Sequence, residues 1–310
     1  MENPDIIHLH NLHGYYLNAK ILFEFLAIYN KPIVWTLHDC WNFTGHCTHF
    51  VYEKCERWRT QCCKCPQKKI YPASLFLDNS KSNYLWKKRV FNLPNNLTIV
   101  TPSNWLKDLV EQSFLASHKK KVINNGIDLN VFKPTDGNFR EQHSLDNIKI
   151  VLGVANVWGR RKGLDDLMEL SKKLSDDYKI VLVGVNKKQQ NTLPENILAL
   201  ERTANAAELA HLYTTADVFV NPTYEDNYPT VNLEALVAGT PVVTYNTGGS
   251  VESVLENNIC EQGNIDMLKT MIERVALEKK EIVDKNVERF DKKYMIESYL
   301  ELYNKIMIVE

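Results

Sequence analysis

Residues 217–246 read DVFVNPTYEDNYPTVNLEALVAGTPVVTYN and predict a strand, a loop, a helix and a second strand, in that order. The two outer runs, DVFVNPT (217–223) and TPVVTYN (240–246), are rich in the β-branched and aromatic residues of strands. The helix is expected to begin at Pro229, whose missing N–H does no harm at a first helical position. A strand, a helix and a strand in this order predict a parallel pair joined by a crossover.

The same alternation extends along most of the chain. Further strands are predicted at 5–10, 32–38, 97–103, 120–126, 148–156 and 178–185, with helices after residues 14, 78, 103 and 163 and near 206–215. A turn-rich passage near 130–147 separates two such blocks. The expected fold class is therefore α/β, with two Rossmann-like domains facing across a cleft. Their expected bounds are 1–140 and 141–285, followed by a helix over 286–310.

The composition excludes several classes of function. The chain has 310 residues and a formal net charge of −1, so no general electrostatic attraction to nucleic acid is expected. No run of about 18 apolar residues predicts a membrane span. The beginning of the sequence lacks the pattern of a signal peptide, and a reducing cytoplasmic compartment is expected.

Acidic residues lie on both sides of the predicted helix start at Pro229. Ligands of open α/β sheets bind beyond the carboxyl ends of the strands, where this helix begins. The free N–H groups of residues 230–232 are suited to a phosphate. Glu234, further along the helix, is placed to accept hydrogen bonds from a ribose. Glu225 and Asp226 either contact a sugar or merely complement the helix dipole.

These motifs resemble the retaining glycosyltransferases of family 4, which have the GT-B fold. Asp226 and Glu234 match the spacing of that family's two donor-site acids, and EALVAGTPVV followed by TGGSVESV resembles its helix, strand and glycine-rich turn. VINNGIDLNVFKP resembles the interdomain segment. The resemblance implies a nucleotide-diphosphate sugar as donor, a saccharide or lipid-linked saccharide as acceptor, no cofactor required for catalysis, and no nucleic-acid partner.

The resemblance also implies roles for individual residues. Catalytic roles fall to His38, Asp226 and Glu225, and substrate binding falls to Arg161, Lys162, Asn227, Tyr228, Pro229, Thr230, Glu234, Gly248 and Gly249. The family has an arginine where this chain has Val157, so Arg161 or Arg160 is expected to replace it, with Arg161 preferred. A solvated helix face is the alternative for these cations. His38 is expected to contact the donor sugar or order the acceptor.

A cysteine-rich loop is expected over residues 39–75. Cys47, Cys55, Cys62 and Cys65 could hold a structural Zn²⁺, although their spacing is not that of a common zinc finger. Disulfides are less expected in a reducing compartment, and free thiols are the remaining alternative.

Relative to the family, roughly the first half of the N-terminal domain is expected to be absent. The leading hypothesis is a glycosyltransferase of bacterial surface polysaccharide synthesis, and motifs such as HDCW and TGHC favour an exopolysaccharide, capsule or colanic-acid type. The alternative is a non-catalytic nucleotide-sugar binder or one half of a split enzyme. The basic segment 83–93 suggests either a contact with the inner face of the membrane or an ordinary solvated helix.

Overall fold

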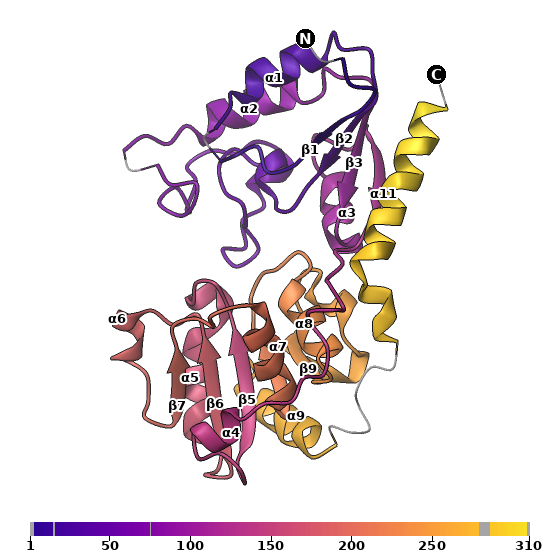
Figure 1. Ribbon diagram of the computed structural model, residues 1–310. Coiled ribbons are helices and arrows are strands. Elements are labelled where there is room, and N and C mark those ends of the chain that lie inside the picture. The colour runs from indigo at the N-terminus through magenta and orange to yellow at the C-terminus, as the bar shows by residue number, and fades with distance from the viewer. Residues whose placement is uncertain (1–2, 15, 75, 279–285, 309–310) are drawn as a thin grey trace. The chain divides into compact units, whose positions relative to one another are not determined.

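The computed structural model describes residues 3–14, 16–74, 76–278 and 286–308 (Figure 1). It divides into two compact units: unit 1 is Met1–Asn124 with Met295–Glu310, and unit 2 is Asn125–Tyr294. The division expected from the sequence, after residue 140, lies beyond the first junction. The expected boundary at residue 285 falls outside the described residues.

Unit 1 contains one four-stranded parallel sheet, in the order β1-β2-β3-β4. The strands are β1 (Ile7–Leu9), β2 (Ile33–Thr36), β3 (Leu97–Thr101) and β4 (Lys119–Val122). The helices are α1 (Ala19–Leu26), α2 (Ser80–Val90) and α3 (Asn104–Glu111), and most of α11 (Lys292–Met307) also belongs to this unit. Each strand pairs in parallel with its neighbour in the sequence, and the parallel pairing is as the alternation of strands and helices predicts.

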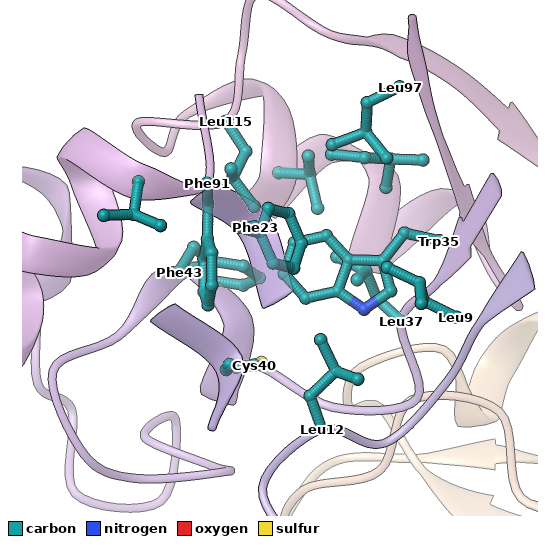
Figure 2. Close-up of a cluster of buried hydrophobic side chains, with 14 of the residues drawn as sticks. Leu9, Leu12, Phe23, Trp35, Leu37, Cys40, Phe43, Phe91, Leu97 and Leu115 are labelled. Atoms are coloured by element: carbon teal, nitrogen blue, oxygen red, sulfur yellow. The ribbon is translucent and has the colours of Figure 1, made fainter. Parts of the chain in front are cut away.

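Both faces of this sheet are buried. Trp35 of β2 packs against Phe23 and Phe91, with ring centroids 4.9 Å from each (Figure 2). The adjacent Val34 belongs to a separate cluster that includes Leu302 of α11. This alternation follows from the two-residue period of a strand, and coverage of both faces is usual for a parallel sheet.

Unit 2 contains a six-stranded parallel sheet, in the order β10-β9-β8-β5-β6-β7. The strands are β5 (Lys149–Val154), β6 (Tyr178–Val183), β7 (Ile197–Leu200), β8 (Val218–Asn221), β9 (Val242–Tyr245) and β10 (Ile259–Cys260). The helices are α4 (Phe139–Gln142), α5 (Leu164–Lys173), α6 (Lys187–Gln190), α7 (Ala206–Thr215), α8 (Thr230–Val237) and α9 (Ile265–Leu277). Phe219 and Val220, neighbours on β8, belong to different core clusters, so this sheet is also covered on both sides.

Two details differ from the sequence-based expectation. Pro229 is the N-cap of α8 and not its first helical residue, because its ψ of 119° is extended. The C-terminal helix begins at Lys292, since Val287–Phe290 forms a 3₁₀ turn. By contrast, the helix expected after residue 103 is confirmed as α3, and the Ser103 side chain caps it by accepting a hydrogen bond from the Leu106 N–H at 3.2 Å.

Candidate functional site

The strand order of unit 2 identifies where a ligand would bind. From β5 the chain continues through β6 and β7 to one edge, and β8 then returns to the other side of β5. Such a reversal is a topological switch point, beyond which open α/β sheets bind their ligands. The loop after β5, residues 155–163, and the loop after β8, residues 222–229, meet at this point.

Hydrogen bonds join these two loops. The Tyr224 N–H donates to the Arg161 carbonyl at 2.8 Å, and the Arg161 guanidinium donates to the Glu225 carbonyl at 2.8 Å. Lys162 forms an ion pair with Asp226, with Nζ and Oδ2 2.5 Å apart. Both side chains of this pair are about one-fifth exposed, at 20% and 18%. The pair therefore lies where a bound anion could still reach it.

The structure gives different surroundings to the neighbouring residues Arg160 and Arg161, and to Glu225 and Asp226. The Arg160 side chain is 81% exposed, its Nε lying 3.7 Å from Asp165, whereas Arg161 is fixed to the acidic loop. Glu225 is fully buried, while Asp226 keeps access to solvent. Arg161 and Asp226 are thus better placed to touch a ligand than their neighbours.

A glycine-rich turn fixes the position of Asp226. The Gly249 N–H donates to the Asp226 carbonyl at 3.0 Å. Gly248 has a φ of +52°, and a Cβ there would lie 2.1 Å from the same carbonyl oxygen. Only glycine fits this left-handed conformation at such a close approach. The turn and the acidic loop therefore form one rigid unit.

We expect Gly248→Ala to destabilise unit 2 by about 1–3 kcal/mol, because it adds both strain and a clash. Gly159→Ala is the matched control, since a Cβ at Gly159 would meet nothing within 4 Å. Chemical unfolding of both variants measures the difference. Equal stability of the two would contradict this account of the turn.

The start of α8 offers fewer free donors than the sequence predicted. The N–H groups of Thr230 and Val231 have no acceptor within the helix, as at any helix start. The Asn232 N–H, predicted to be free, donates to the Pro229 carbonyl at 3.2 Å. This correction follows from Pro229 being the cap, which places Asn232 one 3₁₀ turn beyond it.

Glu234 is held by a residue that the sequence analysis missed. The Tyr213 hydroxyl, on the fully buried side chain of α7, donates to Glu234 Oε2 at 2.9 Å. Burial raises the pKa of Glu234, and the hydrogen bond from Tyr213 opposes this rise. Only the packing of α7 against α8 reveals this pair.

The two predicted donor-site residues before Pro229 are mostly buried. Asn227 is 4% exposed and Tyr228 is 6% exposed. The Tyr228 carbonyl accepts a hydrogen bond from the Asn125 side chain at 3.3 Å. Their place in the loop is therefore fixed chiefly by packing and by contacts within unit 2.

Histidines gather at the carboxyl end of the unit 1 sheet. His38 follows β2, and its Nε2 lies 2.9 Å from His10 Nδ1. Burial lowers the pKa of His38, so it is neutral near pH 7 and can accept a hydrogen bond as well as donate one. The next residue, Asp39, forms an ion pair or hydrogen bond with His13 at 2.8 Å. His8 is satisfied by Thr36 and Tyr303.

A cavity of about 700 Å³ lies in unit 1, within the usual range for ligand sites. Its lining includes His13, the rings of Trp41 and Trp86, and the amides of Asn79 and Asn83. Aromatic faces beside amide groups suit a sugar, whose rings carry both C–H faces and hydroxyls.

The basic segment 83–93 is oriented differently from a membrane-binding helix. Lys87 is fully buried and donates to the carbonyls of Trp41 at 2.7 Å and Thr44 at 3.1 Å. Phe91 is also fully buried in the core. Lys88 and Arg89 remain exposed, which fits the alternative of a solvated helix face. Among the described residues, no helix is long and apolar enough to cross a membrane.

The predicted zinc ligands lie together without forming a ready-made site. One small cavity has Cys47, Cys55, Cys62 and Cys65 in its lining. As the side chains stand, the described part of the chain contains no group of three or more His, Cys, Asp or Glu residues that could hold a metal ion. The zinc assignment therefore stays a prediction.

Comparison with known families identifies the class of protein. Residues 136–293 match the family described as Glycosyl transferases group 1, and residues 1–131 match Glycosyltransferase Family 4. The chain belongs to the group 1 glycosyltransferases, and the family resemblance seen in its motifs is confirmed.

Individual relatives agree with this assignment. The chain is 27% identical to the putative colanic acid biosynthesis glycosyl transferase WcaC of Escherichia coli, over 90% of this chain and 68% of WcaC. It is 26% identical to the capsular polysaccharide biosynthesis glycosyltransferase CapM of Staphylococcus aureus, over 57% of this chain and 51% of CapM.

Solved structures confirm the GT-B fold. Sucrose-phosphate synthase from Thermosynechococcus elongatus has a TM-score of 0.74 at 18% identity, over 99% of this chain and 74% of that protein. HepE of Anabaena, in complex with UDP, has a TM-score of 0.69 at 18% identity, over 97% of this chain and 79% of HepE.

Proposed function

We propose that this glycosyltransferase takes a sugar from a nucleotide-diphosphate donor and transfers it, with retention of configuration, to a saccharide or lipid-linked saccharide. The product would enter a bacterial surface polysaccharide. The observation that carries the proposal is the meeting of Arg161, Lys162 and Asp226 at the switch point of unit 2.

Each residue has a role suited to its chemistry. Arg161 and Lys162, with the α8 N-terminus, would neutralise the diphosphate, whose negative charge grows as the sugar leaves. Asp226 would contact the donor sugar once the diphosphate draws Lys162 from their ion pair. Glu234, held by Tyr213, would accept hydrogen bonds from the ribose hydroxyls.

Unit 1 is proposed to bind the acceptor. Neutral His38 would hydrogen-bond a sugar hydroxyl, and the 700 Å³ cavity beside His13 would hold part of the saccharide. The names of the two relatives described above place them in colanic acid and capsule synthesis. Another relative is named as a transferase acting on a diphospho-undecaprenol acceptor. Such an acceptor would bring the protein to the inner face of the membrane from the cytoplasm.

Calorimetric titration of the 310-residue chain with UDP and GDP, then with their sugar conjugates, tests the proposal. We expect one of the two diphosphates to bind and its sugar conjugate to release nucleotide. Binding without release would favour the alternative of a non-catalytic donor-binding protein or a partner-dependent enzyme. Absence of binding by every nucleotide tested would overturn the donor-site assignment.

A further inference from the structure

The chain between β2 and α2 has little regular structure to hold it together. It contains only two short 3₁₀ turns among its described residues, η1 (Trp41–Phe43) and η2 (Arg57–Arg59). Irregular segments of this length are uncommon inside compact domains unless something orders them. A small aromatic core contributes: Trp58 is buried, and its ring lies 4.9 Å from Phe50.

Five cysteines of this segment lie around one small cavity. The cavity, of about 10 Å³, is lined by Cys47, Cys55, Cys62, Cys63 and Cys65, and its volume is close to that of a single water-sized sphere. All five are free of disulfides. The Gly45 N–H donates to Cys62 Sγ at 3.2 Å. N–H donors to sulfur are typical around metal-bound thiolates.

A second observation at the cavity also points to a ligand. His46 lines it, is only 9% exposed, and its Nε2 has no hydrogen-bond partner among the described residues. Leaving a buried nitrogen without a partner is unfavourable. A metal-bound thiolate in this cavity would offer an acceptor to this nitrogen when it carries the ring proton.

The charge around the cavity is also complementary to a thiolate centre. Lys87 is fully buried, and Asp39, Cys47 and Cys62 lie near enough that negative charge on them would stabilise its ammonium. A buried cation is strongly unfavourable without negative charge nearby. Four thiolates around a divalent cation carry two net negative charges, which Lys87 and the neighbouring Arg57 would offset.

We propose that Cys47, Cys55, Cys62 and Cys65 bind one structural Zn²⁺ that orders the loop between β2 and α2. Zinc prefers tetrahedral sulfur ligands at about 2.3 Å, and Cys62-x-x-Cys65 supplies two of them from one short turn. The thiols must converge from their present positions, which rotation about the single Cα–Cβ bond of cysteine permits. Each thiol releases its proton to solvent as the metal binds.

Cobalt(II) titration of the full chain, after removal of metals with a chelator, tests the proposal. We expect the visible absorption of tetrahedral, thiolate-bound cobalt, saturating at a single ion per chain and abolished by zinc. Cys47→Ser and Cys62→Ser should each lose this spectrum. Cys63→Ser, which changes a cysteine of the same cavity that is not a proposed ligand, and Cys260→Ser, a buried thiol of unit 2, should keep it.

Wild-type chain that shows no such spectrum, or a Cys47→Ser variant that binds cobalt like the wild type, would overturn the proposal. A second measurement uses the wild type alone, so that it does not depend on the folding of a cysteine variant. Zinc should protect residues 39–79 from limited proteolysis and shield four thiols from a thiol reagent. Disulfides among these cysteines, in protein purified under reducing conditions, would also refute the zinc proposal. Nucleotide binding by unit 2 is independent of every one of these results.

Discussion

Replacing Glu234 by alanine should weaken binding of the diphosphate nucleotide by about 10- to 100-fold. Hydrogen bonds to a charged group contribute about 1.5–3 kcal/mol, and each 1.4 kcal/mol is a factor of ten in affinity. The carboxylate is mostly buried and directed by Tyr213, so water cannot readily take its place. Calorimetry with UDP or GDP, whichever the wild type binds, measures the change.

Two further variants distinguish the loss of a ribose contact from a general disturbance of the fold. Glu234→Gln keeps an acceptor for Tyr213 but removes the charge, so affinity should fall while the fold is retained. Tyr213→Phe should give a smaller loss of nucleotide affinity, because it removes the hydrogen bond to the Glu234 carboxylate but leaves the carboxylate in place. If Glu234→Ala bound the nucleotide as tightly as the wild type, the ribose role would be wrong.

The pH dependence of binding provides an independent check on Glu234. Burial raises its folded-state pKa, so the folded protein holds this proton more tightly than the unfolded chain does. The residue therefore opposes folding at neutral pH, and this penalty disappears as the pH falls through the raised pKa. Nucleotide affinity should fall over the same pH range, and the Glu234→Gln variant should lack that dependence.

Lys162→Ala should remove most of the preference for a diphosphate over a monophosphate. The substitution deletes a cation and leaves Asp226, its partner at 2.5 Å, as an uncompensated negative charge beside the phosphates. Affinity for UDP or GDP should drop by about tenfold or more, whereas affinity for the monophosphate should change little. Where the wild type releases nucleotide from a sugar donor, turnover should fall by roughly 100- to 1000-fold.

Arg160→Ala is the matched control for this experiment. Arg160 is the neighbouring cation of the same turn, but its side chain is 81% exposed and directed away to Asp165. Loss of an exposed charge of this kind should change nucleotide affinity by less than about fivefold. Equal losses in the two variants would mean that net charge, and not the position of Lys162, controls binding.

Much of the local arrangement of the candidate site could be predicted from the sequence because its motifs are local. Pro229, the acids around it and Gly248 lie close together in the chain, and a strand followed by a loop and a helix fixes their arrangement. The partner of Glu234 could not be predicted, because Tyr213 reaches it from another helix. The preference for Arg161 over Arg160 had no physical basis in the sequence, since a one-residue step along a 3₁₀ turn decides which guanidinium meets the acidic loop.

The basic segment 83–93 shows the limit of reading charge from sequence. Lys87 looks like part of a solvated or membrane-binding face, yet its ammonium is buried against the carbonyls of Trp41 and Thr44. These carbonyls belong to the loop after β2, and nothing in the sequence indicates that this loop, more than any other, lies beside Lys87. A buried cation depends on acceptors from distant segments, and such acceptors leave no local signal.

By itself, the sequence determined the alternation of strands and helices, the parallel sheets and the family to which the chain belongs, because all of these depend on short-range periodicity and on motifs. The tertiary structure decided that β5 and β8 are neighbours, that Lys162 pairs with Asp226, and that four cysteines spread over the 47–65 segment share one cavity. These contacts join residues far apart in the chain. They form only when burial of both faces of each sheet fixes the order of its strands.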